Sequence, residues 1–376
     1  MSEPIRISHI PPIVQKFIAL NWGLVFLIVL LACTGFLALY SAAGGQLDPW
    51  ASRQITRFCI GVLGMVIIAV IDIRVWYRLA YPIYAAGFVS LVVVEIFGHI
   101  GMGAQRWINL GFIQIQPSEF MKIAVIMALA KYFHAAAPED MRSVRFLLPA
   151  GLLIVAPIIL VLLQPNLGMA VMTGAGGAAM LFLAGAPLIW FIGGGAAVVA
   201  AIPLIWSFMH DYQKRRVMTF LNPESDPLGA GYNIIQSKIA LGSGGISGKG
   251  FLNGTQSHLN FLPEKQTDFI FTLWAEEWGL MGGTALILLI ALILMYCMWI
   301  AFRCRHAFGR LLAYGLMINF SLYIFINVAM VMGLIPVVGI PFPLLSYGGT
   351  SMLAALVGFG LILSCSIHRD AKLPRM

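Results

Sequence analysis

Charged side chains are scarce in this chain. They make up 10% of its 376 residues, with only 15 acidic residues, whereas hydrophobic residues make up 60%. Soluble domains carry roughly 25% charged residues, so the composition excludes a protein that faces water over most of its surface. Short segments of alternating polarity are lacking too, which excludes an outer-membrane β-barrel. The sequence therefore predicts an all-α, polytopic integral membrane protein.

Cysteine is also rare, with five residues, and none lies in a segment predicted to be external. No disulfide framework or thiolate metal site is therefore indicated. A nucleotide phosphate loop is lacking as well, because the glycine-rich residues 242–250 have no Ser or Thr after Lys249 and no strand precedes them. We interpret residues 242–250 as a flexible loop, whose backbone N–H groups and Lys249 could still contact a pyrophosphate.

The chain has many long hydrophobic runs, and a membrane-spanning helix needs about 20 apolar residues. We predict ten spans, which form a helical bundle and cover residues 20–40, 55–71, 79–97, 117–133, 146–163, 167–186, 187–207, 269–301, 311–332 and 345–366. An even number puts both termini on one side. We expect one membrane domain over residues 1–376, with a large loop at 208–268 between the seventh and eighth spans. Within this loop, residues 231–241 predict a short helix on the membrane surface that ends at Gly242.

The positions of lysine and arginine predict the orientation. With the amino terminus inside, thirteen basic residues fall in inner segments, namely Arg6, Lys16, Arg74, Arg78, Lys131, Arg142, Arg145, Arg303, Arg305, Arg310, Arg369, Lys372 and Arg375. The short outer loops hold three, which are Arg53, Arg57 and Arg106. Because inner loops carry the excess of basic residues, both termini are expected in the cytoplasm and the long loop outside.

The fourth span carries two opposite charges, Glu119 and Lys122, although ionisable residues at membrane depth are costly. Pro117 suits the first turn of this helix. A spacing of three residues puts both side chains on one helical face, within ion-pair reach. Two interpretations stay open: a structural ion pair that holds the bundle together, or one wall of a polar substrate cavity.

Arginine and tryptophan in the outer loops are equally ambiguous. Trp107 is typical of the aromatic belt at a membrane interface. Arg106 beside it, and Arg53 in the first outer loop, suit either an anchor for lipid headgroups or a donor to a phosphate. The sequence does not distinguish these roles.

Another costly acid, Asp268, lies where the long polar loop meets the eighth span. A helix amino terminus favours negative charge, so an ordinary helix-terminal aspartate is one interpretation. Thr272 and Glu276 follow at intervals of four residues and share a helical stripe with Asp268, so we expect this stripe to line an interior cavity. Residues 341–350, rich in proline and glycine, predict an irregular start of the tenth span beside such a cavity.

Five polar strings follow one another along the ten spans: Gly-Ala-Gln-Arg106-Trp107-Ile, Gln116-Pro-Ser118-Glu119-Phe-Met-Lys122, Gly248-Lys249-Gly-Phe-Leu-Asn-Gly-Thr-Gln-Ser, Leu262-Pro-Glu264-Lys265-Gln-Thr-Asp268-Phe-Ile-Phe and Pro343-Leu-Leu-Ser346-Tyr-Gly-Gly-Thr-Ser. Together they resemble the SEDS family, the proteins of shape, elongation, division and sporulation. The resemblance covers most of the chain. The second and third strings are more similar to the elongation (RodA) type than to the division (FtsW) type.

The resemblance implies a bacterial peptidoglycan glycosyltransferase that polymerises lipid II on the outer face of the cytoplasmic (inner) membrane during elongation. In this chemistry the donor sugar is α-linked to undecaprenyl pyrophosphate and the new bond is β-1,4, so the transfer inverts the anomeric carbon. A general base must take the proton of the attacking hydroxyl. The essential aspartate of the family matches Asp268, which is therefore the expected base.

The pyrophosphate leaving group calls for positive charge. The resemblance suggests Arg53, Arg106, Lys122 and Lys249 as sources, alone or with a divalent cation, Mg²⁺ or Mn²⁺. Glu119 would hold Lys122 or ligate that cation. Further contacts with the substrate are expected from other residues of the strings and from Glu276 of the Asp268 stripe; those of the strings are Trp107, Gln116, Ser118, Glu264, Lys265 and Ser346.

The resemblance also implies partners: a class B penicillin-binding protein that cross-links the product, lipid II, and membrane lipids, with no nucleic acid. Two alternatives from other classes are a lipid II flippase and a non-catalytic scaffold for cell-wall enzymes. Transporters usually show paired repeats with broken helices in both halves, and no convincing repeat relates residues 1–186 to 187–376. A scaffold would leave the polar strings unexplained.

Overall fold

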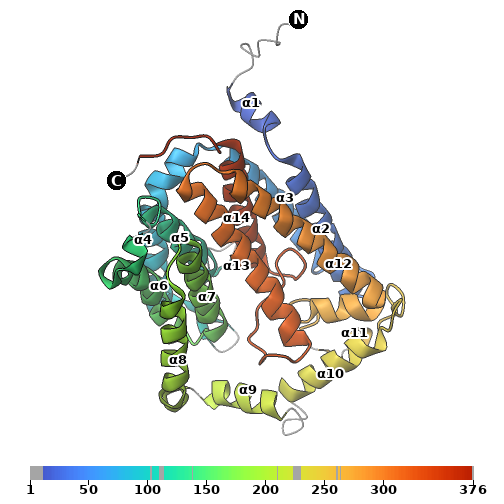
Figure 1. The fold of residues 1–376 in the computed structure, drawn as a ribbon. Coiled ribbons are helices and arrows are strands. Elements are labelled where there is room, and N and C mark those ends of the chain that lie inside the picture. The colour runs from blue at the N-terminus through green and yellow to red at the C-terminus, as the bar shows by residue number, and fades with distance from the viewer. Residues whose placement is uncertain are drawn as a thin grey trace, which may run out of the picture.

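The structure is a computed structural model that describes residues 12–101, 104–109, 114–137, 139–209, 211–222, 230–259, 261–262 and 264–374. Arg6 and Arg375, which contribute to the predicted orientation, lie outside these residues, as does Gly103 of the first polar string. Long helices lie side by side as a bundle (Figure 1). The short helix α1 (Pro12–Ile18) and the end of the described chain lie at one end of it, opposite the long segment before the eighth predicted span.

Ten helices coincide with the ten predicted spans: α2 (Trp22–Ala42), α3 (Ala51–Val70), α4 (Ile73–Phe97), α5 (Pro117–Tyr132), α6 (Val144–Leu163), α7 (Leu167–Leu183), α8 (Leu188–Phe208), α12 (Ile270–Arg303), α13 (Ala307–Val331) and α14 (Gly349–Ile367). Seven of them are long and apolar enough to cross a membrane. The other three are α5, with 16 residues, α7 and the apolar part of α8, Leu188–Leu204, which are shorter. The predicted polytopic helical bundle is confirmed.

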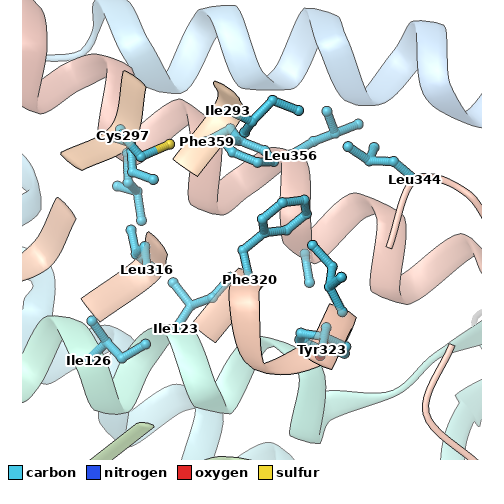
Figure 2. Close-up of a cluster of buried hydrophobic side chains, with 14 of the residues drawn as sticks. Ile123, Ile126, Ile293, Cys297, Leu316, Phe320, Tyr323, Leu344, Leu356 and Phe359 are labelled. Atoms are coloured by element: carbon cyan, nitrogen blue, oxygen red, sulfur yellow. The ribbon is translucent and has the colours of Figure 1, made fainter. Parts of the chain in front are cut away.

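Helix α5 is the centre of the bundle. It packs against α4, α6, α7, α13 and α14, and every residue except Phe120 and Tyr132 is buried. Because α5 has neighbours on all sides, it is buried around its whole circumference, and the charged side chains that it carries lie inside the bundle as well. Figure 2 shows part of this core, in which Ile123 of α5 lies near Leu316 and Phe320 of α13 and Phe359 of α14.

The all-α prediction is incomplete, because the connection between α4 and α5 forms a small antiparallel sheet. Its strands β1 (His99–Gly101), β2 (Ala104–Asn109) and β3 (Gln114–Ile115) are arranged in the order β1-β2-β3. His99 pairs with Trp107, and Ile108 pairs with Ile115. A long-range contact fixes the sheet to the bundle, since the Thr350 hydroxyl of α14 donates to the Gln114 carbonyl at 3.0 Å. A 3₁₀ turn (Asp140–Arg142) precedes α6.

In the long segment before α12, the described residues form three helices, α9 (Asp211–Leu221), α10 (Ala230–Ser243) and α11 (Thr255–His258). Figure 1 shows α9 and α10 lying across the end of the bundle. The predicted helix at 231–241 corresponds to α10, which continues through Gly242 to Ser243. It does not lie only on a surface, because Ile234 and Ser237 are buried and the Ser237 hydroxyl lies 2.8 Å from that of Thr272 on α12.

Residues 244–250 are fastened to a break in α12, which corrects the prediction of a flexible loop. Gly279 has φ +62° and ψ −160°, a conformation open essentially only to glycine, so it interrupts the helix. Leu280 N–H donates to Gly245 O at 2.9 Å, and Lys249 N–H donates to Glu276 O at 3.1 Å. Backbone groups that a broken helix exposes inside a bundle need such partners. The N–H groups of Lys249 and Leu280 therefore bind carbonyl oxygens within the protein.

Candidate active site

Asp268 lies in a tight turn directly before α12. Within the turn, the N–H of Thr267 donates to Glu264 O at 3.0 Å, and the Thr267 hydroxyl donates to the Glu264 carboxylate at 2.8 Å. The N-cap of α12 is Phe269, so Asp268 precedes the cap, and its side chain is half-buried. Asp268 therefore lies outside α12, next to its amino terminus.

Three hydrogen bonds from distant parts of the chain hold this turn. Tyr347 N–H donates to Gln266 O at 2.8 Å, and the Ser346 hydroxyl donates to Thr267 O at 2.6 Å. The side-chain amide of Asn327, on α13, donates to the backbone carbonyl of Asp268 at 2.9 Å. The turn that carries Asp268 is thus fixed against α13 and the start of α14. That start is irregular, as residues 341–350 predict, and the helix begins only at Gly349.

An apolar cavity of about 360 Å³ adjoins this turn. It lies between the start of α7, the end of α13 and residues 335–340, and its lining is Arg106, Pro165, Asn166, Leu167, Gly168, Val171, Val217, Phe325, Ile326, Ile335, Pro336, Val337, Val338 and Ile340. Gly339, in the same wall, faces Asp268, because a Cβ atom at this position would lie 3.4 Å from the carboxylate oxygen Oδ2. Gly339 lies between the lining residues Val338 and Ile340, so the Asp268 carboxylate lies close to the backbone of the cavity wall without being part of the lining.

Arg106 is the cationic residue of the cavity lining. Its Nε donates to the Gln164 carbonyl at 3.1 Å, and its Nη2 donates to that of Pro165. These bonds fix the guanidinium where α6 ends and α7 begins. Trp107 lies beside it in β2 and is partly exposed, whereas Arg53 is an exposed residue of α3. A different arginine, Arg57, lies against the start of α14, with its Cζ atom 5.3 Å from the ring centroid of Tyr347.

Lys249 and Glu276 contact each other rather than an open cavity. The Lys249 ammonium lies 2.8 Å from Oε1 of Glu276, whose side chain is fully buried. The same carboxylate accepts from the N–H groups of Gln256 at 2.9 Å and Ser257 at 3.1 Å, and from the Ser257 hydroxyl at 2.7 Å. The stripe predicted to line a cavity with Asp268 instead faces protein, since Thr272 contacts α10 and Glu276 holds residues 249–257.

Glu119 and Lys122 lie inside the bundle, each 2% exposed. Lys122 Nζ lies 3.1 Å from Oε2 of Glu119 and 3.0 Å from the sulfur of Met169. The hydroxyl of Tyr323, on α13, contacts both charged groups. Glu119 and Tyr323 also line a second, small cavity of about 20 Å³, enough for one water molecule. These contacts favour the structural ion pair over the wall of a large substrate cavity.

The remaining predicted residues lie near the start of α5 or in and around the Asp268 turn. Gln116 and Ser118 are buried at the start of α5, and Ser346 is buried in the turn before α14, where its hydroxyl also accepts from Phe342 N–H at 2.8 Å. Glu264 is exposed. Lys265 is 9% exposed and donates to Ser257 O at 2.8 Å, and this burial lowers the pKa of its ammonium. Of these residues, Glu264, Lys265 and Ser346 contribute to the Asp268 turn itself.

A metal centre held by the protein is not formed by the described residues. Among them, no group of three His, Cys, Asp or Glu side chains is placed to hold a metal ion. The predicted divalent cation therefore lacks a preformed set of protein ligands in this part of the chain.

Two residues that hold the site were not identified from the sequence, Asn327 and Tyr323. Asn327 is completely buried, and Tyr323 is one turn earlier on the same helix. A polar residue inside an apolar span was the available signal, because such residues usually have a partner or a function. Their partners come from α5 and from the turn before α12, which the sequence of α13 alone does not reveal.

Comparison with known proteins gives consistent matches over most of the chain. A family model described as cell cycle protein, covering FtsW, RodA and SpoVE, matches residues 20–371. The peptidoglycan glycosyltransferase MrdB of Escherichia coli K12 is 46% identical over 348 residues, which are 91% of this chain and 93% of that protein.

Solved structures also match. One chain of a peptidoglycan synthase complex that coordinates polymerization and crosslinking aligns with a TM-score of 0.82 and 34% identity, over 94% of this chain and 99% of that one. The rod shape determining protein RodA of Thermus thermophilus aligns with a TM-score of 0.71 and 28% identity, over 94% of this chain and 98% of that one.

Proposed function

We propose a mechanism for a chain that belongs to the FtsW, RodA and SpoVE family of cell cycle proteins and is of the RodA type. The chain is a peptidoglycan glycosyltransferase of cell elongation. Its proposed substrate is lipid II, a disaccharide peptide on undecaprenyl pyrophosphate, which it joins into β-1,4 glycan strands. The observation that carries the mechanism is the fixed turn of Asp268 beside an apolar cavity.

Asp268 acts as the general base in this mechanism. Its carboxylate takes the proton of the acceptor 4-hydroxyl while that oxygen attacks the anomeric carbon of the donor. The new C1–O4 bond forms on the face opposite the breaking C1–O bond, and undecaprenyl pyrophosphate leaves with the bonding electron pair. A base held in a defined turn suits this step, because small errors in its position are costly.

The leaving pyrophosphate is stabilised by positive charge, and Arg106 is the residue we favour. It lies in the lining of the cavity and is held by two carbonyl oxygens. Lys249 and Lys122 are weaker candidates, because each is paired with a glutamate. The apolar lining of the cavity suits the hydrocarbon part of the donor next to its pyrophosphate.

A divalent cation, Mg²⁺ or Mn²⁺, remains part of the proposal without a step assigned to it. Such cations often bind mainly through the phosphates of a substrate, with one or two protein carboxylates. Glycan synthesis in the presence of EDTA, with Mg²⁺ or Mn²⁺ then added back, tests the requirement.

The proposed location is the bacterial inner membrane, with the Asp268 end of the bundle outside. The predicted excess of basic residues at the opposite end supports this orientation. The proposed partner is a class B penicillin-binding protein, and the similarity to a chain of a synthase complex that couples polymerization to crosslinking supports it. Membrane lipids surround the bundle.

The test is reconstitution of the purified protein in liposomes with labelled lipid II, alone and with its partner. The wild type is expected to form glycan polymer and the Asp268→Asn variant none, because an amide cannot accept the proton. Polymer from Asp268→Asn at the wild-type rate would refute the assignment of the base. Transfer of lipid II across the membrane without polymer would support the flippase alternative, and neither activity would support a scaffold.

A further inference from the structure

Asn327 connects the two sides of the candidate site. This residue of α13 is 0% exposed, and its Nδ2 donates to the backbone carbonyl of Asp268 at 2.9 Å and to that of Ile340 at 2.7 Å. Asp268 is 59 residues away in the chain and Ile340 is 13 residues away. One amide group therefore joins the turn that carries the carboxylate to the wall of the apolar cavity.

The chemistry of these contacts restricts which type of side chain can occupy position 327. Both carbonyl groups belong to irregular backbone inside the bundle, where unpaired acceptors are costly. A carboxamide has two N–H donors on one nitrogen, and here that nitrogen faces two acceptors. An aspartate of the same shape has no N–H group, and when ionised its charge would face two carbonyl oxygens. A leucine would leave both acceptors unpaired.

We propose that Asn327 is a positioning residue for the transfer reaction. It sets the position of the Asp268 carboxylate relative to residues 338–340 of the cavity wall, and so aligns the base with the bound substrate. Asn327 itself touches no reacting atom. This inference rests on the proposed role of Asp268 as the base.

The expected effect is on turnover more than on binding, because the cavity lining comes mostly from other residues. In Asn327→Asp we expect kcat to fall about 10- to 100-fold, the scale of a misplaced catalytic group, with KM changed less than about threefold. Asn327→Ala is expected to behave in the same way. Asn327→Gln, which keeps both N–H groups, is expected to recover at least about threefold in kcat over Asn327→Asp.

The experiment measures initial rates of glycan formation over a range of lipid II concentrations in proteoliposomes. Size-exclusion chromatography selects monodisperse protein, and a melting curve shows that each variant is folded at the assay temperature. Whichever of the Asp and Ala variants is folded is used. The control is Ser321→Ala on the same helix, since the Ser321 hydroxyl donates only locally to Ile318 O at 2.8 Å. It is expected to keep kcat within about twofold of the wild type, the scale of a small local change.

The outcomes separate the two proposals. An active Asp268→Asn variant overturns the proposed base and this inference with it. An inactive Asp268→Asn variant together with wild-type kcat in Asn327→Asp or Asn327→Ala overturns the inference alone. Equal losses in kcat for the Asp, Ala and Gln variants, with KM rising by the same factor, would also overturn it, because that pattern indicates general damage to the fold.

Discussion

The ammonium of Lys249 and the carboxylate of Glu276 form an ion pair with 2.8 Å between Nζ and Oε1, although 27 residues separate them. Glu276 is buried on α12, and Lys249 lies in the glycine-rich segment that packs on the break in that helix. The pair fastens the segment before α11 to the helix that follows the Asp268 turn. Lys265 adds a link from the turn to the same segment through Ser257 O.

Replacement of Glu276 by alanine is expected to destabilise the protein by about 3 kcal/mol. The change removes the carboxylate that pairs with Lys249 and accepts from the N–H groups of Gln256 and Ser257, and removal of one partner from a buried pair typically costs this much. Thermal unfolding in detergent measures the loss. The matched control is Asp370→Asn, which breaks an exposed pair with Arg305 and should change stability by less than about 0.5 kcal/mol. Equal melting temperatures for both variants would contradict this role of Glu276.

Gly279→Ala and Gly248→Ala are each expected to prevent correct folding or to cost about 3 kcal/mol or more. A Cβ atom at Gly279 would lie 2.3 Å from Gly248 N, and one at Gly248 would lie 2.1 Å from Glu277 O. Both glycines also have positive φ. The control is Gly194→Ala in α8, where no atom lies within 4 Å of the added Cβ. The yield of monodisperse protein reports the result, and wild-type yield of Gly279→Ala would show that the break tolerates a side chain.

The Glu119 and Lys122 pair is expected to behave as a structural pair in a double-mutant cycle. Glu119→Gln or Lys122→Met alone leaves one charge buried at 2% exposure and should cost about 3–5 kcal/mol. The double variant removes both charges and should be more stable than either single variant. Melting temperatures measure stability, and glycan synthesis by the double variant measures activity. Activity restored along with stability supports a structural pair, whereas a stable and inactive double variant would support the catalytic interpretation.

The protein is expected to lose stability in acid because of a histidine at the end of the bundle opposite Asp268. His306 is the N-cap of α13, where its Nδ1 accepts from Gly309 N–H at 2.9 Å, and burial lowers the pKa of this imidazole. The unfolded chain then binds the proton more readily than the folded one, so stability is full above about pH 6.5 and falls as the pH decreases below it. His306→Asn keeps an acceptor at the N-cap and does not titrate there.

Melting temperatures between about pH 5 and 8, across the ordinary histidine pKa, check this expectation. The drop on acidification should be smaller in His306→Asn than in the wild type. It should not vanish, because burial also lowers the pKa of His368 at the end of α14. The same drop in both proteins would rule out His306 as a source of the pH dependence.

The predicted spans and the position of Asp268 could be derived from the sequence because both depend on local information. An apolar run such as Val144–Leu163 has to be a helix in a membrane, whatever its neighbours are. Glu119 and Lys122 are three residues apart on one helix, so their pairing could also be predicted from the sequence. The small sheet was missed, because β3 has only two residues and is held by β2 and by Thr350 of α14.

The roles of Glu276 and Asn327 could not be derived in this way. Helical periodicity correctly places Glu276 on the same stripe as Thr272, but it does not say whether that stripe faces a cavity or packed protein. Its partners lie 19 to 27 residues away, in the glycine-rich segment and in the four-residue helix α11. Asn327 has its partners 13 and 59 residues away, one before and one after its own helix.

The sequence by itself therefore determines a polytopic helical membrane protein of this family with Asp268 at the start of the eighth predicted span, because hydrophobic length and short polar strings are local properties. Only the tertiary structure decides that the glycine-rich segment closes a break in α12, that Lys249 pairs with Glu276, and that Asn327 joins the Asp268 turn to the cavity wall. The physical reason is that buried polar groups must find partners, and inside a bundle those partners come from distant parts of the chain.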